Sequence, residues 1–192
     1  MSTFYTKGII LTQTDRGEAD QLFSIYTLSN GKVSALGRAT KKIQSKLNPS
    51  LQQFAILELM IATGKSHDHV AAVKIEKNFA NIKNDLKKIV LGSYALELVE
   101  KLTKIDSPDP KMFTLLVKYF TALEENSFED SEWQVVKQAF AVKLLTILGL
   151  EPKEEVIADA KKFDNFLVNQ LDAQLNTEQF MLKISSLTPL DM

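Results

Sequence analysis

Residues 8–27 read GIILTQTDRGEADQLFSIYT, two short segments rich in β-branched and aromatic residues on either side of Asp15-Arg16-Gly17. A turn between two such segments indicates a β-hairpin. The same pattern recurs around Ser29-Asn30-Gly31 and continues to about residue 77. We expect strands at 4–13, 20–28, 32–38, 52–62 and 69–77, with a short helical or irregular crossing segment at about 41–48. Five strands in this order predict an OB-fold, a partly open barrel that commonly binds single strands or oligosaccharides.

The hydrophobic period changes after Asn78, where apolar residues begin to recur at helical spacing. The segment from Ile89 to Leu102 is apolar almost all round, which is typical of a core helix. Further helices are expected at 112–123, 132–148, 155–173 and 177–186, with Gly149 as a C-cap. The sequence therefore predicts an α+β multidomain protein, with an N-terminal OB-fold β-barrel nucleic-acid-binding domain at 1–78 and an all-α helical domain at 79–192.

The composition excludes several classes of protein. The chain has 45% hydrophobic and 24% charged residues, as expected for a globular protein with a sizeable core. It contains no cysteine, so disulfides, thiolate zinc sites and cysteine nucleophiles are excluded. No segment approaches the roughly 18–20 apolar residues that span a bilayer. We therefore expect a soluble cytoplasmic protein without a membrane partner.

The net charge of −1 hides a difference between the two halves of the chain. Residues 1–80 carry 10 basic and 6 acidic side chains, whereas residues 81–192 carry 13 and 18. The interval between Asp20 and Glu58 contains no acidic residue at all. The basic side chains in this interval are Lys32, Arg38, Lys41, Lys42 and Lys46. Alternation along a strand places the first two on one face, so we expect a basic strip that attracts phosphates through counterion release.

Aromatic side chains in the predicted barrel could add base stacking to such a strip. Phe23, Tyr26 and Phe54 are the candidates, since stacking contributes about 1–3 kcal/mol per base. The alternative for each is a place in the barrel core. For the basic residues, the alternative is a soluble surface decorated with lysines.

His67 and His69 are the only histidines in the chain. They could offer metal ligands, but alternation projects them to opposite faces of a strand and no third ligand is evident. No nucleophile-elbow motif accompanies them, so a catalytic triad is not indicated. We interpret them as part of a solvated hairpin loop and expect no metal, no cofactor and no catalytic residue.

Several segments, taken in order, resemble the RecO family of recombination-repair proteins. They are GIILTQTDRGEADQLFSIYT (8–27), NGKVSALGRATKKIQSKL (30–47), QQFAILELMI (52–61), NFANIKNDLKKIVLGSYALELVEKL (78–102), PDPKMFTLLVKYFTAL (108–123) and FAVKLLTILGLEP (140–152). The resemblance covers about residues 4–152. Many members of the family follow the last segment with four zinc-binding cysteines, and this chain resembles a short member that lacks them.

The resemblance implies a mediator without a catalytic centre. Such a protein binds single- and double-stranded DNA, promotes strand annealing and helps load the recombinase RecA, with RecR and single-strand-binding protein as partners. It would associate with the nucleoid during repair. The family's basic strand and loop fall on Lys32, Arg38, Lys41, Lys42 and Lys46, and a conformational turn signature falls on Gly17, Glu18 and Asp20. The alternative is an OB-fold protein–protein adaptor with weak or no DNA binding.

Overall fold

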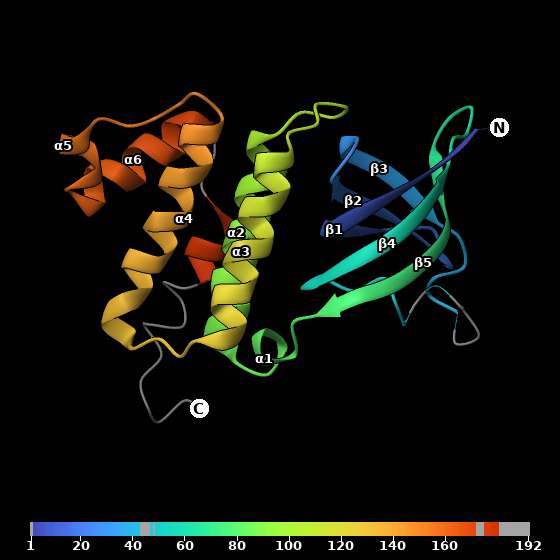
Figure 1. Ribbon diagram of the computed structural model, residues 1–192, viewed down its shortest axis with the longest axis horizontal. Coiled ribbons are helices and arrows are strands. Elements are labelled where there is room, and N and C mark those ends of the chain that lie inside the picture. Colours follow the sequence, from blue (N-terminus) through green and yellow to red (C-terminus); the bar gives the residue numbers. More distant parts are fainter. Residues whose placement is uncertain (1, 43–46, 48, 172–174, 181–192) are drawn as a thin grey trace.

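The computed structural model describes residues 2–42, 47, 49–171 and 175–180. Its first part is a closed five-stranded barrel with strand order β1-β2-β3-β5-β4 (Figure 1). The strands are β1 (Thr3–Arg16), β2 (Asp20–Thr27), β3 (Gly31–Gly37), β4 (Ala55–Ala62) and β5 (Asp68–Asn78). A helical region follows, so the predicted order of an OB-like barrel and then helices is confirmed. Of the predicted crossing segment, residues 43–46 and 48 lie outside the described residues.

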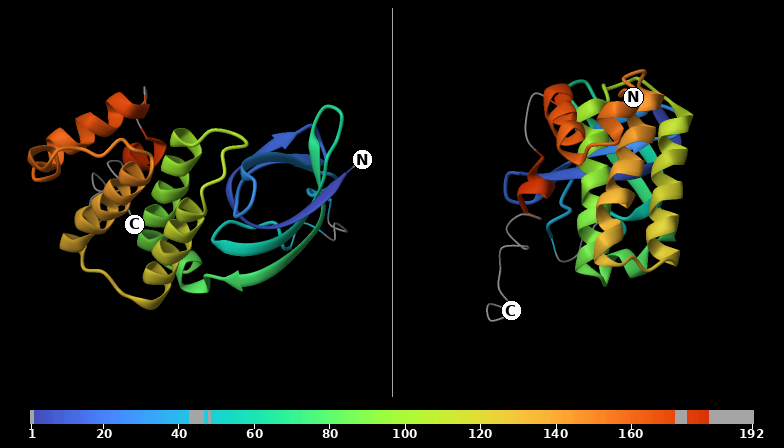
Figure 2. Two further views of the ribbon diagram at one scale, coloured as in Figure 1. Left: turned by 45° about the horizontal axis from the view of Figure 1, so that its top comes forward. Right: turned by 90° about the vertical axis from the view of Figure 1, so that its left-hand side faces the viewer.

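The first strand closes the barrel by pairing on both of its edges. Residues Thr3 to Gly8 pair with β4, and Gly8 to Arg16 pair with β2. A register shift between Ile10 and Thr12 marks the irregularity that lets one strand serve both partners. The parallel pairing of β3 with β5 completes the ring, which the left view of Figure 2 shows end-on. Ile10, Phe23, Ile25, Leu57 and Ile61 are fully buried inside it.

The fourth strand begins later than its sequence pattern predicted, at Ala55 rather than at residue 52. Phe54 immediately before it adopts a positive φ of 56° and is buried. Its ring packs edge-on against Phe120 with the centroids 5.7 Å apart. Gly92 lies beneath the same ring, where an added Cβ would come within 2.6 Å of it. The chain therefore turns Phe54 outward from the barrel to bury its ring among the helices.

The helical region comprises α1 (Ala80–Lys83), α2 (Leu86–Leu102), α3 (Pro110–Glu125), the 3₁₀ turn η1 (Asp130–Glu132), α4 (Trp133–Ile147), α5 (Glu154–Ile157) and α6 (Ala160–Leu171). Asp85 and Asp109 cap α2 and α3 by accepting hydrogen bonds from first-turn amides. Gly149 takes a φ of 72° just after α4, as expected of a C-cap. The helix predicted at 155–173 is interrupted at Ala158 and Asp159, and residues 181–186 of the last predicted helix lie outside the described residues.

Barrel and helices meet through a shared apolar core. Figure 1 shows α2 and α3 between the barrel and α4. Ile9, Leu11 and Tyr26 from the outer barrel surface belong to the same buried cluster as residues of these helices. The Tyr26 hydroxyl donates a hydrogen bond to the Asp109 carbonyl and accepts one from the Asp109 amide, at 3.3 and 3.2 Å. We propose that two domains, 1–78 and 79–192, fold against one another through this core.

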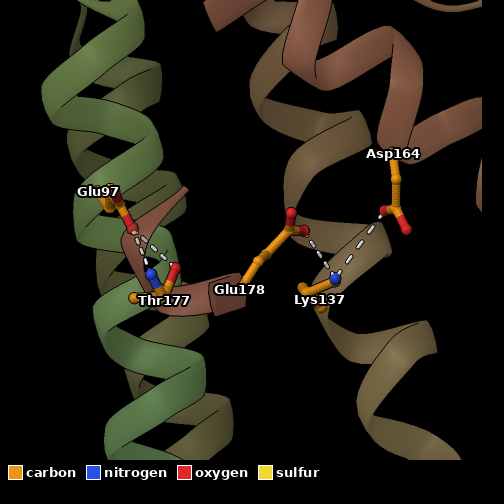
Figure 3. Close-up of polar contacts among 5 residues, drawn as sticks. All are labelled: Glu97, Lys137, Asp164, Thr177 and Glu178. Atoms are coloured by element: carbon orange, nitrogen blue, oxygen red, sulfur yellow. Dashed lines mark hydrogen bonds and ion pairs between the residues drawn. The ribbon is translucent and has the colours of Figure 1, made fainter. Parts of the chain in front are cut away.

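The segment 175–180 docks onto the helices through charged groups (Figure 3). Glu97 of α2 accepts hydrogen bonds from the Thr177 amide and hydroxyl, at 3.0 and 2.8 Å. Lys137 of α4 is buried, and its ammonium lies 2.9 Å from a Glu178 oxygen and 4.0 Å from an Asp164 oxygen. We call Lys137, Asp164 and Glu178 the buried ion cluster. It joins α4, α6 and the segment 175–180.

Candidate nucleic-acid interface

The β1–β2 hairpin holds the chain that leaves β3. The Asp20 carboxylate accepts a 2.7 Å hydrogen bond from the Ala39 amide, and the Ala19 carbonyl accepts one of 3.0 Å from the Lys41 amide. Ala39 itself adopts a positive φ of 54°. These contacts fix the backbone between Arg38 and Lys42 although it lies beyond the end of the strand. The predicted turn signature therefore includes a residue, Asp20, that positions the basic segment.

Three basic side chains project from this segment, and we call Arg38, Lys41 and Lys42 the basic edge. All three residues are exposed. The Lys41 ammonium lies 2.7 Å from the Asp15 carboxylate on the hairpin. This hydrogen bond, followed by one from Gln21, lowers the pKa of Asp15. The charge of Lys41 is thus partly neutralised in the free protein. Arg38 contacts His69 and forms no ion pair with a carboxylate of the described residues.

Lys32 has a different environment from the basic edge. Its side chain is buried against α2, where the ammonium donates a 2.5 Å hydrogen bond to the Glu100 carbonyl. A carboxylate oxygen of Glu100 lies 3.8 Å away, and the other accepts a 2.5 Å hydrogen bond from the Ser24 hydroxyl. The Lys32 carbonyl accepts from the Asp106 amide at 3.0 Å. Alternation placed Lys32 on the outer face correctly, but the helical region covers that end of the strand. Lys46 lies outside the described residues.

The outer face of β2 and β3 stays partly open between α2 and the basic edge. Ser24 pairs with Ser34, and Leu22 pairs with Leu36 one step nearer the basic edge. Ser34 is exposed and the two leucines are half-buried. In OB-folds the surface of these two strands and the neighbouring loops bind oligonucleotides. The open part of this surface ends at Arg38.

The aromatic residues that could have stacked on bases are buried instead. Phe23 and Tyr26 are 0% and 1% exposed, and Phe54 is 6% exposed. Phe23 fills the inside of the barrel, whereas Tyr26 and Phe54 pack against the helices. The hypothesis that these three rings stack on bases is therefore wrong. Among the described barrel residues the exposed aromatic is Tyr5, on the outer surface of β1 with 75% of its surface accessible.

The two histidines do not share one environment. His67 is exposed in the β4–β5 connection, as the hairpin-loop interpretation expected. His69 is half-buried on β5, and its Nε2 lies 3.4 Å from Nη2 of Arg38. The parallel pairing of Leu36 with His69 brings them together. Sequence reasoning missed this contact because the two residues are separated by 31 positions and nothing local signals a parallel pair. The described residues hold no group of three His, Asp or Glu side chains suited to a metal ion.

A groove lies between α3 and α4. It has a volume of about 810 Å³ and is lined mainly by apolar side chains, among them Leu115, Tyr119, Phe128 and Phe140. Lys111, Lys118 and Lys143 also line it. Burial raises the pKa of Tyr119, whose hydroxyl donates a 3.4 Å hydrogen bond to the Leu91 carbonyl. The groove therefore combines an apolar floor with positive charge. None of the described helices is both long and apolar enough to cross a membrane.

A closed barrel of this topology with a basic edge defines the chain as an OB-fold protein with an appended helical region. Two family models match it, Recombination protein O N terminal over residues 1–79 and Recombination protein O C terminal over residues 83–160. The chain belongs to the RecO family.

Curated relatives named DNA repair protein RecO are similar over most of the chain. The protein from Alkaliphilus metalliredigens is 28% identical over 147 residues, 77% of this chain and 58% of the relative. That from Dehalococcoides mccartyi is 29% identical over 159 residues, 83% and 61% respectively. That from Geobacter sulfurreducens is 30% identical over 143 residues, 74% and 57%. The matched part of this chain thus corresponds to about three fifths of each relative's length.

Proposed function

We propose that the chain acts in DNA repair as a DNA-binding recombination mediator. It binds single- and double-stranded DNA through the barrel, promotes annealing and helps load a recombinase onto single strands covered by single-strand-binding protein. The observation that carries this proposal is the basic edge, exposed at the end of the open β2–β3 surface and held there by the β1–β2 hairpin. Membership of the RecO family supports it.

Charge supports a division of labour between the two parts. The exposed cations of the basic edge can release counterions from phosphates, which gives affinity with little sequence preference. The helical region carries excess negative charge and would repel a polyanion. Lys32 contributes by tying β3 to α2, because its ammonium is already bound to Glu100. Direct phosphate contacts are therefore assigned first to Arg38 and Lys42, and to Lys41 when it leaves Asp15.

The remaining parts of the proposal concern partners and chemistry. A RecR-like protein and single-strand-binding protein are the proposed protein partners, and the helical region is the surface we assign to them. No step in this proposal makes or breaks a covalent bond, so the chain is proposed to act without catalysis, cofactor or metal. Its place of action would be the cytoplasm, at the nucleoid during repair.

A second candidate function is a protein–protein adaptor with weak or no DNA binding. The groove between α3 and α4 favours it, since an apolar floor beside Lys118 and Lys143 suits a peptide that carries both apolar and acidic side chains. The pairing of Lys41 with Asp15 also reduces the free positive charge on the barrel. DNA affinity and its salt dependence separate the two candidates.

Replacing Arg38 and Lys42 together with alanine is expected to weaken binding of a single-stranded oligonucleotide roughly tenfold at 0.1 M salt. The slope of log K against log salt should fall by about 1.4, because each lost phosphate contact removes about 0.7. Fluorescence anisotropy at several salt concentrations measures both quantities. Stability should change by less than about 0.5 kcal/mol per substitution, as for other surface changes.

The matched control removes the same charge from the groove, by Lys118→Ala with Lys143→Ala. Its DNA affinity and salt slope should stay close to those of the unchanged protein. Equal losses in both double variants would mean that overall charge, and not the basic edge, attracts the DNA. No measurable binding by the unchanged protein would favour the adaptor.

A further inference from the structure

We propose that His69 is a second phosphate ligand, which acts with Arg38 as a clamp on one backbone phosphate and takes up a proton as DNA binds. This inference rests on the proposed DNA-binding function. It assigns a role to a histidine that the sequence placed in a solvated loop. The two side chains come from β5 and β3 and meet through the parallel pairing that closes the barrel.

The geometry leaves one nitrogen of His69 for a ligand. Nδ1 is buried and has no hydrogen-bond partner within the described part of the chain. Nε2 lies on the other side of the ring, 3.4 Å from Nη2 of Arg38. In the free protein an unprotonated Nε2 can accept a hydrogen bond from the guanidinium. Once the imidazole is protonated, Nε2 of His69 and Nη2 of Arg38 can instead both donate hydrogen bonds to phosphate oxygens.

Electrostatic attraction couples the uptake of a proton by His69 to the binding of DNA. Arg38 is the charged group that faces the ring from β3, and the partner of His69 on β4 is Ala62, which is uncharged. The β4–β5 connection carries Lys65 and His67, and the Asp68 carboxylate is occupied by the Gly64 amide at 3.2 Å. A phosphate bound between Arg38 and His69 attracts both cations, so it favours the protonated imidazole.

Binding should therefore tighten as the pH falls from 8.0 to 5.5, the range in which an imidazole gains its proton. We expect a gain of roughly tenfold over this range, which is within the limit of tenfold per pH unit that the uptake of one proton allows. The chain has only two histidines, so a matched control exists in His67→Gln. The test is the affinity for a labelled oligothymidylate at constant ionic strength, for the full chain and for each variant.

The unchanged protein and His67→Gln should both tighten on acidification, while His69→Gln should show a flat profile. His69→Lys, which keeps a positive charge throughout, should bind at pH 8.0 as tightly as the unchanged protein does at pH 5.5. At pH 5.5 the losses of binding free energy caused by Arg38→Ala and by His69→Gln should not be additive, because both side chains bind the same phosphate. A thermal melt of each variant confirms that it is folded.

A pH-dependent gain retained in His69→Gln, or lost in His67→Gln, would refute the clamp and leave the proposed function standing. Binding that does not change with pH in the unchanged protein would refute it equally. If neither the unchanged protein nor any variant binds DNA at any pH tested, both the clamp and the proposed function are refuted.

Discussion

Replacing Gly31 with alanine is expected to destabilise the protein by about 3 kcal/mol, the sum of a strained backbone and an overpacked contact. Gly31 starts β3 with a φ of 67°, a conformation that L-residues rarely adopt. An added Cβ would also lie 2.5 Å from the carbonyl carbon and oxygen of Ser107, in the connection between α2 and α3. Backbone atoms cannot rotate away, so barrel and helices would have to separate.

Gly17 offers a matched control for this prediction. It has the same φ of 67°, but an added Cβ would meet no atom within 4 Å. Gly17→Ala should therefore cost only the conformational part, about 1 kcal/mol. Urea denaturation of the two variants measures the difference. A similar decrease in the free energy of unfolding for both variants would show that the close contact between residue 31 and Ser107 contributes nothing to the effect of Gly31→Ala.

Replacing Lys137 with methionine should cost about 3 kcal/mol at pH 7, near the lower end of the range for breaking a buried ion pair. The value lies at that end because the side chains of Glu178 and Asp164 retain 21% and 42% exposure. Methionine fills the space of the lysine stem but leaves two carboxylates without a cation. Lys143→Met, on the exposed side of the same helix, is the control and should change stability little.

The loss of stability caused by Lys137→Met should become smaller as the pH falls. Burial raises the pKa of Asp164, Lys137 lowers it, and Glu178 raises it. Without the lysine the pKa of Asp164 should rise further. A carboxyl whose folded pKa exceeds its unfolded value stabilises the fold when protonated and loses that contribution as the pH rises through the folded pKa. Denaturation of Lys137→Met at pH 7 and pH 5 should therefore show a smaller deficit at pH 5, and an equal or larger one would contradict the buried ion cluster.

Local patterns predicted most of the elements because the physics of each is local. The turns after Arg16 and before Gly31 mark the two hairpins, and the change from a period of two to one of 3.6 marks the start of the helices. Interruptions were harder to predict, because the apolar spacing continues through Ala158 and Asp159. There the Asp159 carboxylate accepts a 3.1 Å hydrogen bond from the Lys162 amide and starts a new helix.

The candidate site was less predictable because its character depends on contacts between distant segments. Alternation predicts the face on which Lys32 lies, but only the position of α2 shows that its ammonium is bound to Glu100. In the same way, Tyr26 has an outward position on its strand, yet the helices cover it. Arg38 and His69 meet through the pairing of β3 with β5, which has no turn to announce it. The composition indicated that the barrel is positively charged, but tertiary packing determines which of its basic side chains are exposed.

The buried cluster shared by Ile9, Tyr26 and the helices has a thermodynamic consequence. Because the barrel cannot unfold without exposing apolar surface of the helices, the two parts should melt in one cooperative transition. A ligand that touches only the barrel then protects the helices as well. At a free concentration one hundred times its dissociation constant, an oligonucleotide would stabilise both parts together by about 2.7 kcal/mol. DNA bound to the barrel would thereby stabilise the helical region, the surface proposed for protein partners, without changing the shape of that surface.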